Sequence, residues 1–253
     1  MSQALREMGS LYWADRTGGR LFLADKTRIL LKAISAQIRL ALPGRTASAL
    51  SVDEALLAWP DTPLCGGALA FVESSHTPWL LNHCLRTYLW ARILGLGHGL
   101  AHDPELLFLA CVFHDLGLSE AGPALSPQPA ECFAVEGAWG ARRWLQEHEC
   151  PAARAELIAE AISLHTNIEV AASAGMEAHL LHEGAALDVV GSRYREVAAS
   201  QRNTVLRDHP RLNMKRELMQ CFRHEQHCRP DSRIPYMMDK GFARLLRHAP
   251  FEE

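Results

Sequence analysis

The apolar residues of this chain recur mainly at the spacing of an α-helix. Within residues 26–42, Leu31, Ile34, Ile38 and Leu42 follow one another at intervals of three and four positions, which keeps one face of a helix apolar. The alternation of apolar and polar residues that marks a half-buried strand is almost absent. The pattern therefore predicts an all-α fold.

Prolines and glycines indicate where the predicted helices begin and end. Thr77-Pro78 and Asp103-Pro104 each place a capping side chain directly before a proline, which is a common helix start. The second of these helices, over 104–117, is apolar nearly all round, so we expect it at the centre of the fold. The other predicted helices cover 26–42 (ended by Pro43-Gly44), a short segment after the turn at 60–63, 78–95, 134–148, 151–165, 176–190, 210–227 and 236–247, with a loop over 118–131.

Composition and charge exclude several classes of protein. The chain has 253 residues, of which 48% are apolar and 22% charged, as in ordinary globular proteins. Its net charge of −3 offers no basic surface for nucleic acid or an anionic membrane. The longest strongly apolar run, 106–113, is too short to span a bilayer, and residues 1–7 show no signal-peptide pattern. We therefore expect a small-molecule substrate and neither a nucleic acid nor a membrane partner.

The cysteine pattern indicates the redox environment. The chain has seven cysteines, an odd number, and no two of them have C-x-x-C spacing. Several lie in apolar helical segments, as buried reduced thiols do. We therefore expect a cytoplasmic protein.

The chemistry is expected where a charged pair ends the most apolar helix. His114-Asp115 follows the run 106–113. An ionised carboxylate in apolar surroundings is costly unless a cation compensates it, and a helix C-terminus disfavours an aspartate. A divalent metal ion would supply the missing positive charge.

Two further residues complete a predicted ligand set. His83 lies on the inward face of the preceding long helix, and Asp188 lies inside the apolar stretch 185–191. Together with His114 and Asp115 they predict one divalent metal ion held by two imidazoles and two carboxylates. Zinc is the first choice, and Fe²⁺, Mn²⁺ or Ni²⁺ also suits mixed nitrogen and oxygen ligation.

At these residues the chain resembles a known family. The pattern His83, His114-Asp115, Asp188 is similar to that of the HD-domain superfamily of metal-dependent hydrolases, and the surrounding words resemble its cyanamide hydratase-like branch. The chain departs from that branch at Cys84, where the branch usually has Ser, and at Ala134, where it usually has Glu. The matching segments are Asn82-His83-Cys84-Leu85-Arg86-Thr87-Tyr88, Phe113-His114-Asp115-Leu116-Gly117-Leu118, Phe133-Ala134-Val135-Glu136-Gly137-Ala138, Ala161-Ile162-Ser163-Leu164-His165 and Leu187-Asp188-Val189-Val190-Gly191.

The resemblance implies how the chain is organised. We expect a single all-helical HD domain over 1–253, whose metal-site core covers about 60–195. Residues 1–59 form a helical extension that packs onto this core. The helices of 196–253 either close the core or mediate dimerisation, so a homo-oligomer is one expectation.

The resemblance also implies a reaction, the addition of metal-activated water to cyanamide or a nitrile-like relative, giving urea or an amide. Such an enzyme is a hydratase, which is a lyase. Asp115 and His165 are the expected catalytic residues, Asp115 taking a proton from water and His165 giving one to the substrate nitrogen. Asn82, Arg86, Phe133 and Glu136 are tentative residues around the substrate or behind the ligands. A surface salt bridge for Arg86 and a helix-dipole role for Glu136 remain open.

Two other functions remain open. An HD-type phosphohydrolase acting on a nucleotide or another phosphoester would use the same metal site with cations near the phosphate. Many such relatives carry Lys where this chain has Leu118, which counts against this function, whereas a loose set of arginines counts for it. The third hypothesis is a non-catalytic helical sensor or interaction module. The arginines are Arg142, Arg143, Arg193, Arg195, Arg202, Arg207 and Arg211.

Ten other histidines are interpreted as surface or capping residues. For two of them, His179 and His182, a second metal ion is the alternative. The ten are His76, His98, His102, His148, His179, His182, His209, His224, His227 and His248.

Overall fold

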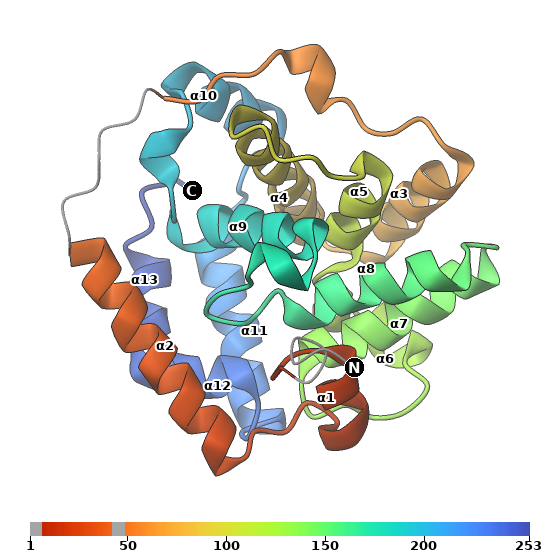
Figure 1. Ribbon diagram of the computed structural model, residues 1–253, viewed down its shortest axis with the longest axis vertical. Helices are drawn as coiled ribbons and strands as arrows, with labels where there is room; N and C mark the ends of the chain where they lie inside the picture. Colours follow the sequence, from red (N-terminus) through yellow and green to blue (C-terminus); the bar gives the residue numbers. More distant parts are fainter. Residues whose placement is uncertain (1–6, 42–48) are drawn as a thin grey trace.

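The computed structural model describes residues 7–41 and 49–253 of the chain (Figure 1). Within these residues no strand forms, and only an isolated bridge joins Leu50 to Val197. The predicted all-α fold is therefore confirmed. The α-helices are α1 (Leu11–Thr17), α2 (Leu23–Ala41), α3 (Pro63–Ser75), α4 (Pro78–Gly97), α5 (Pro104–Phe113), α6 (Ala121–Leu125), α7 (Phe133–Glu147), α8 (Ala152–Leu164), α9 (Met176–Val190), α10 (Ala199–Asp208), α11 (Met214–Cys228), α12 (Arg233–Met237) and α13 (Ala243–Arg247).

The two helices that carry the predicted His and His-Asp residues begin where the sequence predicts. At α5, the Asp103 carboxylate accepts hydrogen bonds from the backbone N–H groups of Glu105 and Leu106, both at 3.0 Å. At α4, Thr77 occupies the N-cap in front of Pro78, although its side chain makes no capping hydrogen bond. Both starts use the fixed backbone angle of proline in the first helical turn.

Helix α5 lies at the centre of the molecule, as its composition predicts. Every residue from Leu106 to Phe113 is buried. The helix packs against α4, α8 and α9, while α4 pairs most extensively with α9 and α7 with α8 (Figure 1). The core thus consists of two helix pairs, α4 with α9 and α7 with α8, around the apolar helix α5.

Helix α5 ends earlier than predicted, at Phe113 instead of Gly117. The His114 side chain donates from Nδ1 to the Cys111 carbonyl at 2.7 Å, which satisfies one of the terminal carbonyls. A short 3₁₀ turn, η3 (Leu116–Leu118), follows. Gly117 is required here because a Cβ at this position would lie 2.0 Å from the Phe133 carbonyl oxygen. The early end places the His-Asp pair in a turn, where both side chains can point the same way.

The structure differs from the prediction in three other segments. The predicted loop 118–131 contains the short helix α6, and the unpredicted helix α10 precedes α11. The predicted helix 236–247 is broken into α12, a π-helical turn and α13, because Gly241 has a φ of +104°. The predicted stop at Pro43-Gly44 lies outside the described residues.

The first and the last helices of the described residues both pack on the core. Helix α1 lies against α8, where the Leu11 N–H donates to the Glu160 carboxylate. Helix α11 packs on α4, and α13 packs on α9, so the C-terminal helices help to close the core. Their role in dimerisation remains a prediction. Among the helices of the described residues, none combines the length and the apolar character needed to cross a bilayer.

Candidate metal centre

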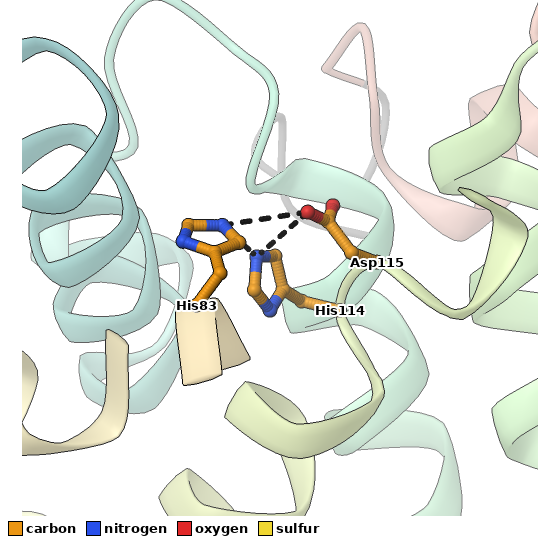
Figure 2. A group of neighbouring side chains, drawn as sticks. All are labelled: His83, His114 and Asp115. Atoms are coloured by element: carbon orange, nitrogen blue, oxygen red, sulfur yellow. Dashed lines mark hydrogen bonds and ion pairs between the residues drawn. The ribbon is translucent and has the colours of Figure 1, made fainter. Parts of the chain in front are cut away.

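Three side chains converge at the end of α5. His83 comes from α4, and His114 and Asp115 come from the turn after α5 (Figure 2). The two histidine Nε2 atoms lie 3.1 Å apart, and each lies 3.4 Å from Asp115 Oδ2. Ligands about 2.0–2.2 Å from one metal ion lie at roughly such distances from one another. These three residues form what we call the ligand group.

Hydrogen bonds behind the ligand group fix which nitrogen of each ring faces it. The Nδ1 atom of His83 donates to Asp188 Oδ2 at 2.8 Å, and that of His114 donates to the Cys111 carbonyl at 2.7 Å. Both Nε2 atoms therefore face Asp115. Metal-binding histidines are usually held in this way, by a carboxylate or carbonyl on the second nitrogen.

The charges of the ligand group favour a cation between its members. Burial lowers the pKa of His114 to about 3, so its imidazole is neutral. Burial alone would raise the pKa of Asp115, but His114, His165 and His83 hold it well below its usual range, so the carboxylate is ionised. Burial also disfavours a charged His83, yet hydrogen bonds to Asp115 and Asp188 raise its pKa. Two imidazole nitrogens and one carboxylate in a buried space fit a divalent metal ion.

His165 adds a third imidazole beside the ligand group. It follows α8, and its Nδ1 donates to the Ile162 carbonyl at 2.6 Å. Its Nε2 lies 3.4 Å from Asp115 Oδ1, the oxygen that does not face His83 and His114. Its ring meets the His114 ring edge-on at 4.9 Å between centroids. Asp115 thus connects the ligand group to His165, the predicted proton donor.

Asp188, the predicted fourth ligand, lies behind His83. Its Oδ2 accepts the hydrogen bond from the Nδ1 side of that ring. Its two oxygens accept hydrogen bonds at 2.8 Å from Arg86 Nε, Arg86 Nη2 and Trp90 Nε1, besides that from His83. Both carboxylate oxygens are occupied by these four donors, and the side chain is fully buried. The carboxylate therefore supports His83 from behind, and direct binding of a metal ion by Asp188 stays a prediction.

Arg86, Trp90 and Arg211 form the setting of Asp188. The open alternative of a surface salt bridge for Arg86 does not apply, because its side chain is fully buried. Trp90 is not among the predicted site residues, and Arg211 is predicted only as part of an alternative phosphate rim. Arg211 Nη1 lies 3.6 Å from Asp188 Oδ1. Spacing could have indicated Trp90, because positions 83, 86 and 90 share one face of a helix.

The three other residues predicted around the substrate are Phe133, Glu136 and Asn82, and they make different contacts. The Phe133 ring is 5.9 Å from the His165 ring, so it lies close to the site. Glu136 is buried and accepts a hydrogen bond from Arg229 Nη2 at 2.6 Å. Asn82 is directed elsewhere, because its side chain donates to the Pro210 carbonyl at 2.8 Å.

Two histidines expected at the surface are buried. His76 is 8% exposed, its Nε2 has no hydrogen-bond partner among the described residues, and burial lowers its pKa to about 4. His182 is 9% exposed, and its Nδ1 lies 3.0 Å from the His165 carbonyl. His182 follows the apolar pair Leu180-Leu181, whereas His76 follows Glu73-Ser74-Ser75, so the sequence around His76 gives no sign of its burial.

The all-α fold and the buried His and His-Asp residues define a helical protein with a candidate metal site. Comparison with family models agrees, because residues 80–208 match the HD domain. The match covers about half of the chain, and the chain belongs to the HD-domain family, whose members are generally metal-dependent hydrolases. The match confirms the predicted superfamily. It does not confirm the cyanamide hydratase-like branch. A search of curated proteins finds no match.

Proposed function

We propose that this protein is a metal-dependent hydratase that adds water to a small carbon–nitrogen substrate, either cyanamide or a nitrile-like relative, giving urea or an amide. The observation that carries the proposal is the convergence of the His83 and His114 Nε2 atoms on the Asp115 carboxylate, with His165 on its other oxygen. Zinc is the first metal to test, and a cytoplasmic location remains part of the proposal.

The residues of the site divide the work among them. His83, His114 and Asp115 would hold the metal ion, which when bound lowers the pKa of a coordinated water from 15.7 to about 7. Asp115 Oδ1, the carboxylate oxygen that faces His165, would accept a proton from that water. His165 donates from Nδ1 to a carbonyl, so its Nε2 is the atom that takes up this proton and passes it to the substrate nitrogen.

The surroundings support an uncharged or basic substrate over a phosphoester. Leu118, three residues after Asp115 in the chain, lines the neighbouring cavity. The arginines that would suit a phosphate rim are engaged elsewhere. Arg193 bonds Glu183 and Glu196, and Arg211 bonds Glu253 and the Asp188 carbonyl. None of the seven arginines of that set lines this cavity.

The test removes one ligand at a time. His114→Ala and Asp115→Ala are each expected to lose both the bound metal, measured by mass spectrometry, and the conversion of cyanamide to urea. The control is His98→Ala, which removes an exposed histidine paired with Glu196 and should keep both. A metal-free variant with full activity would refute the proposal.

A second assay separates the hydratase from the two alternatives. Hydrolysis of a generic phosphoester, with and without added Mn²⁺, should be at background level. Phosphoester turnover that requires His114 would instead support the phosphohydrolase, and wild-type protein purified without metal would support a non-catalytic module.

A further inference from the structure

A cavity of about 400 Å³, within the usual range of small-molecule sites, is lined in part by residues that closely follow Asp115 in the chain. One wall begins two residues after Asp115, and the other is a face of α11. The charge of Asp115 also acts on α11. Burial and this charge together raise the pKa of Cys221 to about 11. The lining residues are Gly117, Leu118, Ser119, Glu120, Pro123, Gln220, Cys221, His224, Glu225 and Arg229.

Helix α11 lies outside the residues matched by the HD-domain model, and it covers the site from one side to the other. At its start, Met214 Sδ lies 2.9 Å from Arg86 Nη2. Farther along, the Phe222 ring stacks on Phe133 with 6.4 Å between centroids. One of the two walls of the cavity is therefore supplied by residues beyond the region that matches the HD-domain model.

A buried cluster with unequal charges forms one end of this cavity. Glu136 and Glu225, each 4% exposed, lie on opposite sides of the single guanidinium of Arg229. Arg229 Nη2 donates to Glu136 at 2.6 Å, but its Nη1 lies 3.5 Å from Glu225 Oε1 and makes no hydrogen bond. Two carboxylates thus share one cation, and we call these three residues the acidic triad.

The acidic triad leaves one acceptor unused. Glu225 Oε2 is buried and has no hydrogen-bond partner among the described residues, although Glu225 lines the cavity. Burying a polar atom without a partner is unfavourable. Burial raises the pKa of Glu225 to about 7, and the charge of Glu136 adds to this effect while Arg229 opposes it. A ligand that brings an N–H donor and a positive charge would satisfy both the acceptor and the charge imbalance.

We propose that this cavity binds a cationic nitrogen group of the substrate, such as an amidinium, guanidinium or primary ammonium, through Glu225. The inference rests on the proposed function in that the reacting carbon of the same molecule lies toward the ligand group. A phosphate or carboxylate group would meet a like charge at Glu120 and Glu225, and the Arg229 cation beside them is already shared by two carboxylates. The substrate class is therefore a small nitrile or cyanamide that carries a basic nitrogen.

Binding of simple probes to the full chain tests this inference without turnover. At pH 8, titration calorimetry with acetamidinium chloride should show binding to the wild type. Tetramethylammonium, which has the charge but no N–H donor, should bind at least tenfold more weakly. Inorganic phosphate should not compete with acetamidinium.

Two variants and a control locate the binding. Glu225→Gln should weaken acetamidinium at least tenfold, and Gln220→Trp, which fills the cavity from an exposed position, should do the same even if Glu225→Gln fails to fold. Glu147→Gln, at an exposed glutamate paired with Arg143, should change nothing. The inference is overturned if acetamidinium does not bind, if both variants bind it like the wild type, or if phosphate displaces it.

The outcomes separate this inference from the proposed function. Acetamidinium binding that depends on Glu225, in a protein without cyanamide hydratase activity, would contradict the proposed reaction and leave the cavity's ligand class intact. Cyanamide turnover by a protein that does not bind acetamidinium would do the reverse.

Discussion

Asp188 illustrates how a buried carboxylate can support a metal-binding histidine from behind. It accepts hydrogen bonds from Arg86, Trp90 and His83, and it is fully buried. A buried carboxylate is stable only with such partners, so moving it to the ligand group would leave Arg86 uncompensated. Its place behind His83 fixes the proton on Nδ1 and leaves Nε2 free for a metal ion.

Replacing Asp188 by Asn should therefore weaken metal binding without abolishing it. The Asp188→Asn side chain keeps a hydrogen-bond acceptor for one donor but loses the charge that orients His83, and changes to such supporting groups lower metal affinity about 10–100-fold. Competition with a chelator of known affinity measures the effect. Asp208→Asn, at an exposed aspartate paired with Arg207, should leave the affinity unchanged. A complete loss of metal, equal to that of Asp115→Ala, would show that Asp188 is a ligand.

Site residues could be predicted from the sequence only where a short local pattern indicates them. The His114-Asp115 pair stands out because it ends an apolar run, and His83 because its helix face also carries Leu80 and Thr87. The position of Asp188 relative to His83 could not be predicted, because it depends on a few ångströms of sliding between α4 and α9. Glu225 gives no signal at all, since glutamate on a polar helix is ordinary.

At the scale of elements, α4 and α9 hold the two halves of the site in contact. Gly184 makes their close approach possible, because a Cβ there would lie 2.4 Å from the Thr87 carbonyl oxygen and 3.0 Å from the Ala91 nitrogen. Both are backbone atoms of α4, which cannot rotate away. The distance between His83 on α4 and Asp188 on α9 depends on this contact.

Gly184→Ala should consequently push α4 and α9 apart. Overpacking of a buried contact typically costs about 1–3 kcal/mol, so the free energy of unfolding should fall by that amount and metal affinity should fall with it. Chemical denaturation and a chelator competition measure the two effects. The control is Gly66→Ala in α3, where a Cβ meets no atom within 4 Å. That change should stabilise the protein by up to about 1 kcal/mol, because alanine favours a helix over glycine. Equal effects of the two substitutions would contradict the packing argument.

Helix starts were predicted better than helix ends or polar helices. Asp103-Pro104 carries its own capping chemistry, whereas the end of α5 is decided by the contact of Gly117 with the Phe133 carbonyl, far away in sequence. Helix α10 buries only Gln201 and Val205. It therefore has no apolar stripe for a periodicity argument to find.

At the scale of the whole molecule, the C-terminal helices complete a site that the HD-domain region begins. Helix α11 supplies Glu225, and the chain after it supplies Arg229, so the acidic triad joins residue 136 of the matched region to residues beyond it. This triad couples the stability of the whole fold to pH. The carboxyl of Glu225 has a pKa of about 7 in the folded protein, against 4.5 without burial.

The sign of this coupling follows from which state holds the proton. Between pH 4.5 and 7 the folded protein keeps a proton on Glu225 that the unfolded chain has released, so stability falls as the pH rises through this range. His76 acts in the opposite direction, because its pKa is lowered to about 4 and unfolding therefore takes up a proton below pH 6.5. A comparison of the wild type with a variant that changes Glu225 alone cancels the contribution of His76.

Glu225→Gln should therefore remove one specific part of the pH dependence. One pKa unit corresponds to 1.36 kcal/mol, so the wild type should lose up to about 3 kcal/mol relative to the variant as the pH rises from 4.5 to 7. Above pH 7 the difference should stay constant. Urea denaturation of both proteins at several pH values measures it, and Glu147→Gln should follow the wild type, because Glu147 is exposed. If the difference in unfolding free energy between wild type and variant does not change with pH, Glu225 has the same pKa in the folded and the unfolded protein. The acidic triad would then carry no buried excess of charge.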